Sequence, residues 1–299
     1  MVLTQLECIP CIIDDLVGAI KLLNLPHKTE KRILNESLVY LSKNFNLQTV
    51  PSYHITHVHR ILKTISETEV PFKDLRSNCN RVGIELADHL SRELEKLSGF
   101  EGFHYLARWA IAGNLLDFRT VGTGYGLSVS RIRENLEDNV KEGLRLNHID
   151  RLYQLLKEGE KKVLYVLDNV GEIAIDKLLI KKIVELGNSV TTTVRGGPIT
   201  SDATLNDAEE INLSASGARI IIAGPDTLGI SWEEKSKDLT DALDEADIVI
   251  AKGQANFYVF SEYKEQIPGN IFCFFTTKCD IVSSIFGFKG KINLAVQLK

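Results

Sequence analysis

The sequence predicts an α/β fold: an open, mostly parallel sheet with helices on both faces, preceded by a helical N-terminal domain. Residues 1–158 place apolar side chains three and four positions apart, which is the period of amphipathic helices. From residue 159 onward, short β-branched runs alternate with helical segments, and this alternation favours a parallel sheet. We therefore divide the chain into a helical domain, residues 1–158, and an α/β domain, residues 159–299.

The helical half is predicted from its apolar spacing. Ile12, Leu16, Ile20 and Leu23 fall on one face of a single helix. The same period recurs in residues 54–67, 75–97, 103–118 and 132–140. Pro and Gly fall mainly between these segments, where they end helices.

The second half is predicted from short apolar runs separated by polar loops. Strands are expected at residues 163–167, 190–194, 219–223, 248–251 and 271–275, with helices at 173–186, 203–211, 235–245 and 258–266. In a sheet of this kind, ligands bind beyond the carboxyl ends of the strands, near a switch in strand order. The residues that follow each strand are therefore the first candidates for chemistry.

Composition limits the function classes. The 299 residues carry a formal net charge of −5, which argues against a nucleic-acid binder because such proteins usually show a basic excess. No apolar run approaches the roughly 18 residues that a membrane span needs, and the N-terminus lacks the pattern of a secretion signal. We expect a cytoplasmic protein that binds neither nucleic acid nor membrane. Whether it forms a homo-oligomer stays open.

The strongest local pattern follows the first predicted strand. Asp168 and Asn169 come directly after five apolar residues, and Gly171 and Glu172 follow them. Carboxylate and amide oxygens are the ligands that a hard divalent cation such as Mg²⁺ prefers. The next helix also begins here, and its N-terminus offers free N–H groups to an anion. The alternative is a simple turn with an N-cap, because Asp and Asn favour both positions.

Polar residues also follow the other strands. Arg195 ends the second strand and suits phosphate, because its planar guanidinium can bind two oxygens. Asp207 lies in the next helix and is either a metal ligand or a solvated charge. Lys252 and Asn256 follow the fourth strand as candidate phosphate contacts, and Lys278 follows the fifth.

Two polar residues interrupt an apolar segment of the helical half. Asn114 and Asp117 stand three residues apart and so share a helix face. Polar groups in such a segment need partners. They either line the active cleft or close contacts between helices.

Cysteines and histidines give weaker signals. Cys8 and Cys11 have the C-x-x-C spacing of zinc or redox sites, but a second pair is missing, so buried structural cysteines are favoured. His54, His57 and His59 are close in sequence, but only His54 and His57 share a helix face. We interpret them as a polar helix surface.

Taken together, these segments resemble the damage-control metal-dependent phosphatases, also called domain-of-unknown-function family 89. The resemblance is carried by residues 8–11, 112–118, 168–172, 202–207, 252–256 and 278–279, and it spans nearly the whole chain in order. The Asp-Asn-x-Gly-Glu and Lys-Gly-Gln-x-Asn segments are the most specific. Ser201 departs from the family pattern, in which Asn often precedes the Asp-Ala-Thr segment.

The resemblance implies a phosphatase that depends on Mg²⁺, Mn²⁺, Co²⁺ or Ni²⁺ and acts on small phosphorylated metabolites such as sugar phosphates. Carried over by motif, the metal ligands are Asp168, Asn169 and Asp207. Lys252 and Asn256 correspond to the phosphate site, and Glu172 to an acidic residue beside the metal; the resemblance makes Asp168 and Glu172 the expected catalytic residues. We expect a metal-activated water as nucleophile rather than an aspartyl-phosphate intermediate. The alternatives are an S-adenosylmethionine-dependent carboxyl methyltransferase and a non-catalytic metal- or phosphate-binding protein.

Overall fold

The structure is a computed structural model that describes residues 2–117 and 129–299. In that part of the chain, seven strands form one sheet in the order β1-β7-β6-β5-β2-β3-β4. Their bounds are β1 Leu146–Asn147, β2 Lys162–Val166, β3 Ser189–Val194, β4 Arg219–Ile222, β5 Ile248–Lys252, β6 Asn270–Thr276 and β7 Asn293–Gln297. All neighbouring strands are parallel except β6 and β7, which pair antiparallel. The predicted mostly parallel sheet is confirmed.

The strand order reverses beside β2. From β2 the chain moves outward through β3 and β4, then returns to place β5 on the other side of β2. The crossovers after β2 and β5 therefore leave in opposite directions, so the carboxyl ends of these two strands form a switch point in strand order, where ligands of such sheets usually bind. Asp168 follows one of these ends and Gly253 the other.

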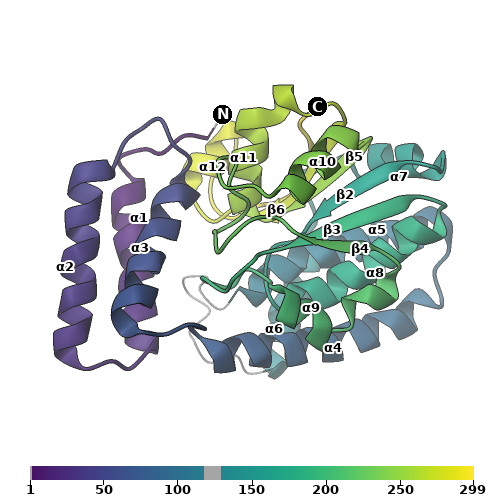
Figure 1. Ribbon diagram of the computed structural model, residues 1–299. Coiled ribbons are helices and arrows are strands. Elements are labelled where there is room, and N and C mark those ends of the chain that lie inside the picture. The colour runs from purple at the N-terminus through teal and green to yellow at the C-terminus, as the bar shows by residue number, and fades with distance from the viewer. Residues whose placement is uncertain (1, 118–128) are drawn as a thin grey trace.

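Helices cover both faces of the sheet (Figure 1). Alternate strand residues point to opposite faces. Tyr165 packs in the core beneath the sheet, with α4, α5, α7 and α8, whereas Leu164 packs in the core above it, with α10, α11 and α12. The bounds are α4 Lys73–Leu94, α5 Gly99–Ala112, α6 Val129–Glu142, α7 Ile149–Lys157, α8 Glu172–Glu185, α9 Leu205–Glu210, α10 Lys237–Glu245, α11 Gln254–Tyr263 and α12 Asp280–Ile285, with short 3₁₀ turns at Gly113–Leu116, Leu213–Ser216 and Lys264–Gln266.

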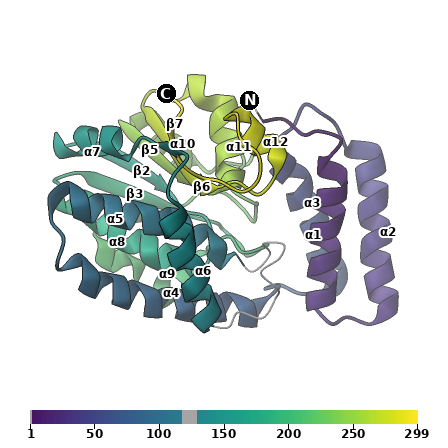
Figure 2. The ribbon, with the colours of Figure 1, turned by 180° about the vertical axis from the view of Figure 1, so that it is seen from behind.

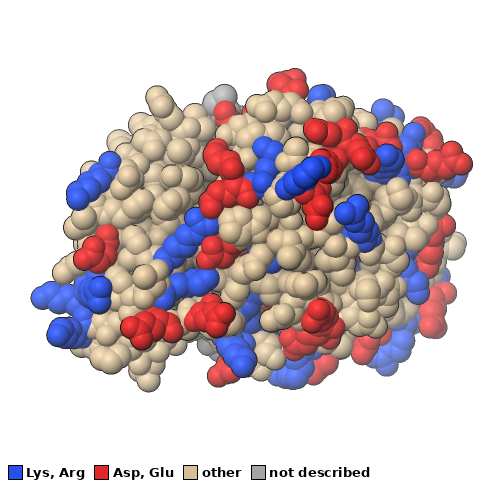
Figure 3. Space-filling view, in the orientation of Figure 1, with Lys and Arg blue, Asp and Glu red and all other residues tan. Residues whose placement is uncertain are grey.

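The first three helices stand beside the sheet rather than on it. They are α1 Cys8–Leu22, α2 His27–Asn44 and α3 Pro51–Ser66, and Figure 2 shows them at one end of the molecule. They bury their own apolar cluster, which includes Leu16, Ile33 and Val58. Arg60 and Lys63 of α3 join this unit to the segment after β4 through ion pairs with Asp226 and Glu234. On the face in Figure 3, acidic and basic side chains lie mixed together.

The predicted elements correspond closely to the observed ones. All five predicted strands exist within one or two residues of their expected bounds, and the described elements of residues 2–145 are helical. The final residue of the predicted helix 103–118, Phe118, lies outside the described residues. Strands β1 and β7 were not predicted. The domain boundary at residue 158 stays a prediction, and the sheet crosses it because β1 pairs with β7. No helix among the described residues is long and apolar enough to cross a membrane.

A close backbone contact fixes α4 against the loop after β2. A Cβ on Gly83 would lie 2.1 Å from the carbonyl oxygen of Gly171, and a Cβ on Gly171 would lie 2.4 Å from the carbonyl oxygen of Cys79. Both distances are shorter than any real contact, so glycine is required at both positions. The approach of α4 holds the start of α8 in place.

We predict that Gly83→Ala destabilises the protein by about 1–3 kcal/mol, the range for overpacking a tight contact. In a free helix the same change would stabilise by about 0.5–1 kcal/mol, so the sign itself is diagnostic. Asp88→Ala, at an exposed position of the same helix, serves as the control. Denaturant unfolding measures both, and a stabilised Gly83→Ala variant would contradict the contact.

Candidate active site

Asp168 lies at the switch point between β2 and β5, directly after the buried strand β2. Its side chain is buried, and a Cβ on Gly253 would lie 1.9 Å from its Oδ2 atom, so the loop after β5 packs on the carboxylate. Burial raises the pKa of Asp168 well above its ordinary value, and the charges of Glu172 and Asp202 raise it further. Lys278 partly opposes this shift. A second positive charge near Asp168 would therefore be strongly favoured.

Glu172, at the start of α8, orients two side-chain amides next to Asp168. Asn169 donates from Nδ2 to Oε2 of Glu172 at 2.9 Å and to Oδ2 of Asp168 at 2.8 Å. Asn114 donates to Oε1 of Glu172 at 2.6 Å and, more weakly, to Asp168 at 3.5 Å. The Oδ1 atom of Asn114 in turn accepts a hydrogen bond from the backbone N–H of Thr276, the last residue of β6. The helical half and the sheet thus meet at this carboxylate.

Lys252 is completely buried and forms an ion pair with Glu172. Its ammonium donates to Oε1 of Glu172 at 2.5 Å, to Oδ1 of Asp176 at 2.8 Å and to the carbonyl oxygen of Ala110 at 2.8 Å. An ammonium has three protons, so all of its donors are used. Tyr165 adds a fourth member by donating to Asp176 at 2.7 Å.

Burial and charge act in opposite directions in this network. Burial lowers the pKa of Lys252, but the carboxylates of Asp176 and Glu172 outweigh it, so the net pKa is raised and the ammonium stays charged. Burial raises the pKa of Asp176 to about 6, although Lys252 counteracts the shift. The network therefore depends on the lysine charge.

A second chain of contacts runs from Asn169 to the site's more exposed side. Ser201 donates to Oδ1 of Asn169 at 2.7 Å and lies 2.8 Å from Oδ1 of Asp117. Lys278 donates to Oδ2 of Asp117 at 2.6 Å. The Lys278 side chain is 36 % exposed, whereas that of Asp117 is 1 % exposed. Lys278 is therefore the cation of this cluster that solvent can reach.

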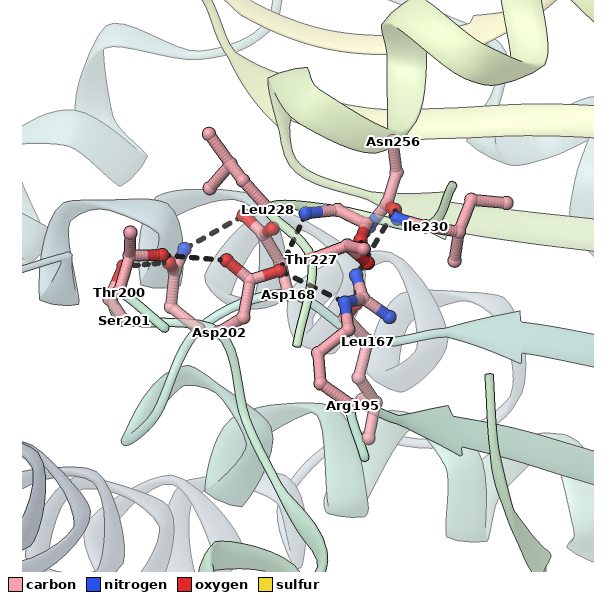
Figure 4. A network of polar contacts seen from close by, with 12 residues as sticks. Leu167, Asp168, Arg195, Thr200, Ser201, Asp202, Thr227, Leu228, Ile230 and Asn256 are labelled. Carbon is pink, nitrogen blue, oxygen red and sulfur yellow. Dashed lines mark hydrogen bonds and ion pairs between the residues drawn. The ribbon is translucent and has the colours of Figure 1, made fainter. Parts of the chain in front are cut away.

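Figure 4 shows a third cluster, in which Asp202 and Asn256 form hydrogen bonds with residues that follow several strands. Arg195 donates to Asp202 at 3.0 Å and to Oδ1 of Asn256 at 3.2 Å. The backbone N–H groups of Gly229 and Ile230, in the loop after β4, donate to the same two side chains at 2.7 and 2.9 Å. The buried Nη1 atom of Arg195 has no hydrogen-bond partner within residues 2–117 and 129–299.

Asp207 is held in a different environment. It closes a capping box with Thr204, accepting its N–H at 2.8 Å and its hydroxyl at 2.6 Å. The same carboxylate accepts hydrogen bonds from Arg76 and, at 3.0 Å, from Asn80. Asn80 also accepts the N–H of Gly171 at 2.8 Å, so Asp207 braces the Asp168 loop indirectly. No hydrogen bond between described residues joins Asp207 to Asp168.

The cluster carries more negative than positive charge. Its carboxylates within the described chain are Asp117, Asp168, Glu172, Asp176 and Asp202, and the cations that contact or face them are Arg195, Lys252 and Lys278. Fully ionised, these groups leave an excess of two negative charges. In the described chain, no three His, Cys, Asp or Glu side chains are grouped closely enough to hold an ion as they stand. Asn169 and Ser201 would supply further oxygens.

The chain resembles known proteins over nearly its whole length. Residues 4–292 match the model of the damage-control phosphatase ARMT1-like domain. This chain belongs to that family. It is 29 % identical over 280 residues to a damage-control phosphatase of Archaeoglobus fulgidus, covering 94 % of each chain. It is also 30 % identical over 292 residues to an uncharacterized protein of Methanocaldococcus jannaschii, covering 97 % of this chain and 94 % of that one.

The fold of this damage-control phosphatase family member matches a solved relative. The crystal structure of a DUF89 family protein from Pyrococcus horikoshii superposes with a TM-score of 0.86 at 26 % identity, and the match covers all of both chains. Family membership makes this chain a phosphatase at the level of the family and confirms the resemblance drawn from its motifs.

Two minor predictions turned out differently in this family member. His54 and His59 are fully buried, so the expected polar helix surface was wrong for both. His54 contacts Tyr40 and Thr49, and His59 pairs with Asp15 of α1 at 2.6 Å. These contacts tie α3 to its neighbours.

The N-terminal cysteines, Cys8 and Cys11, were both predicted to be buried, and this prediction holds for only one of them. Cys8 is buried as expected, but Cys11 is exposed. Burial raises the pKa of the Cys8 thiol.

The sequence did not point to Arg76, Asn80 or Asp176. Arg76 and Asn80 contact site residues that are far away in the sequence, so no local sequence pattern predicts their role. Asp176 did leave a signal. It stands four residues after Glu172, with only apolar residues between them, and two like charges at that spacing on a helix repel each other. Such a pair requires a buried cation between its members, and Lys252 fills that position.

We predict that Lys252→Met destabilises the protein by about 3–5 kcal/mol, because it leaves two buried carboxylates without their cation. Lys237→Met, which breaks the exposed pair with Asp241, should leave the stability nearly unchanged. Both values come from denaturant unfolding at neutral pH. Equal stability of the two variants would show that the buried ammonium is dispensable.

Proposed function

We propose that this protein is a divalent-metal-dependent phosphatase that hydrolyses small phosphorylated metabolites, such as sugar phosphates, in metabolite damage control. The observation that carries the proposal is the excess of carboxylates around Asp168 at the switch point between β2 and β5. Family membership supports the phosphatase chemistry. The divalent metal is inferred from the side chains of the site, and the substrate class from the resemblance to the family.

The residues present fit a hard divalent cation. Asp168 is a buried carboxylate whose pKa is raised by its burial and by the charges of Glu172 and Asp202, so a nearby cation would stabilise its ionised form. Asn169 and Ser201 add neutral oxygens, and oxygen ligands are those that Mg²⁺ and Mn²⁺ prefer. We propose that Asp168 and Asn169 hold the ion. The ion would polarise a phosphoryl oxygen and lower the pKa of a bound water.

The protein's own groups have distinct roles in this proposal. Glu172 and Lys252 orient Asn169 and Asn114, because their hydrogen bonds leave the amides little freedom. Lys278 is the cation best placed for substrate phosphate, since it is partly exposed and its partner Asp117 is not. Positioning and charge supply most of the catalysis in phosphoryl transfer.

Lys252, Arg195 and Asn256 remain proposed phosphate contacts from the sequence. In the structure, however, all three protons of Lys252 are used within the protein. Arg195 and Asn256 bind each other and the strand ends, although the partnerless Nη1 of Arg195 keeps one donor for an oxygen.

The decisive experiment is hydrolysis of p-nitrophenyl phosphate after chelation and re-addition of Mg²⁺, Mn²⁺, Co²⁺ or Ni²⁺. We expect turnover only with a metal, and Asp168→Ala should lose it while staying folded. Asp244→Ala, an exposed aspartate on α10, is the matched control. Methyl transfer from S-adenosylmethionine without phosphate release under any metal would refute the proposal. A screen of phosphorylated metabolites would then identify the substrate.

Asp207 is the proposed third ligand, and a variant pair tests it. Asp207→Ala should destabilise by about 3–5 kcal/mol, because Arg76 is left buried without its partner. Asp207→Asn keeps the size and most of the hydrogen bonds, so it isolates the charge. If Asp207 binds the ion, this variant weakens Mn²⁺ binding about tenfold or more in calorimetric titration. Unchanged Mn²⁺ affinity would assign Asp207 to the support of the loop alone.

A further inference from the structure

The 198–204 segment, residues 198 to 204 after β3, runs antiparallel to the loop that carries the proposed metal ligands. The backbone N–H of Val170 donates to the carbonyl oxygen of Ser201 at 2.8 Å. The backbone N–H of Ala203 donates to the carbonyl oxygen of Asp168, also at 2.8 Å. The geometry of the Asp168 loop therefore depends on where this segment is held.

The start of the 198–204 segment is weakly constrained by its own backbone. Residues 196 and 197 before it are both glycines, which have the widest choice of backbone conformations. The buried Arg76 holds the middle of the segment, because it donates to the carbonyl oxygens of Thr200 and Asp202 at 2.7 and 2.8 Å. The first residue of the segment needs another partner.

Lys63 of α3 is that partner, and it also binds a second loop. Its ammonium donates to the carbonyl oxygen of Pro198 at 2.8 Å and to Oδ2 of Asp226 at 2.6 Å. Asp226 belongs to the loop after β4, and the N–H of Gly229 in that loop donates to the side chain of Asp202. One cation therefore joins the two loops that meet at Asp202 (Figure 4).

Two further residues of α3 bind the loop after β4. Thr56, Arg60 and Lys63 stand four and three residues apart, so they share one face of the helix. The hydroxyl oxygen of Thr56 accepts a hydrogen bond from the backbone N–H of Leu228 at 3.0 Å. Arg60 forms ion pairs with two carboxylates of the same loop. Helix α3 is thus a support for this loop along about two turns.

The charges at this contact balance each other. Within the described chain, Arg60 and Lys63 pair with Asp226 and Glu234, so neither cation is in excess for a substrate phosphate. The ion pairs are also not the only contact that holds α3, because α3 packs with α1 and α2 in an apolar cluster. The side chains of Lys63 and Asp226 are 18 % and 22 % exposed, so solvent screens their attraction only in part.

We propose that Lys63 is a positioning residue for the proposed metal site, acting on the Asp168 loop through the 198–204 segment. The inference rests on the proposed function, since it concerns the same ion. It gives the N-terminal helices a part in the geometry of the site. Because Arg76 also holds the segment, loss of Lys63 weakens ion binding without abolishing it.

The first test measures Mn²⁺ binding to the metal-free full chain by calorimetric titration. Lys63→Met should weaken Mn²⁺ binding about three- to tenfold, less than the roughly 10–100-fold loss that follows when a direct partner of a metal ligand is removed. Lys63→Arg keeps the charge and has donors for both oxygens, so it should restore most of the affinity. Lys31→Met, at an exposed position of α2, is the control and should leave the affinity unchanged.

The second test measures backbone hydrogen exchange of the same variants without metal. Lys63→Met should accelerate exchange in peptides that contain Val170 and Ala203, because their N–H groups join the segment to the Asp168 loop. Peptides from α2 should exchange as in the unmodified protein. A residue that only stabilised the whole fold would instead accelerate exchange throughout the chain.

Unchanged Mn²⁺ affinity in Lys63→Met, or exchange that accelerates uniformly, overturns the proposal. If Lys63→Met does not fold, Asp226→Asn is measured in its place, because it removes the charge of the partner and keeps its size; unchanged Mn²⁺ affinity in that variant has the same meaning. An unmodified protein that binds no Mn²⁺ would refute the proposed function and this inference with it. Binding that is indifferent to Lys63→Met would refute this inference alone.

Discussion

The buried ammonium of Lys252 is the interaction on which the candidate site depends. It lies between Glu172 and Asp176, which share one face of α8, and it also binds the Ala110 carbonyl oxygen of α5. One charge thus joins three elements: strand β5 and two helices from different halves of the chain. If one member of this network is removed, the remaining charges stay buried without a counter-charge, which destabilises the folded protein. The network consequently holds the amides of Asn114 and Asn169 against Asp168.

The position of the site follows from the strand order. Because β5 returns beside β2, Asp168 and Gly253 come from strands far apart in sequence but adjacent in the sheet. The missing side chain at Gly253 lets the loop close over the carboxylate. A residue with a Cβ there would push the loop outward and let water reach Asp168, which would reduce the effect of burial on its pKa.

Local pattern accounts for most of the fold and part of the site. Strand β2 was predictable because five apolar residues precede Asp168, and parallel strands buried on both faces have this composition. Strand β1 has two residues and no pattern of its own; it exists because β7 pairs with it. In the site, the oxygens of residues 168 and 169 were expected. The partners of Asp207 were not, because Arg76 reaches it across more than a hundred residues. Contacts of that kind depend on packing, which no short window contains.

The same packing argument separates two kinds of cation in this protein. Lys252 and Arg195 are buried and satisfied mostly by protein oxygens, so they fix geometry and gain little by releasing a partner to bind substrate. Lys278 is partly in water although its partner Asp117 is buried, so it is the cation of the three that solvent reaches. In the proposed function, it is therefore the one that an incoming phosphate would meet first. In the sequence all three are basic residues at strand ends. Only their burial in the folded protein distinguishes the two that fix the geometry of the site from the one that solvent reaches.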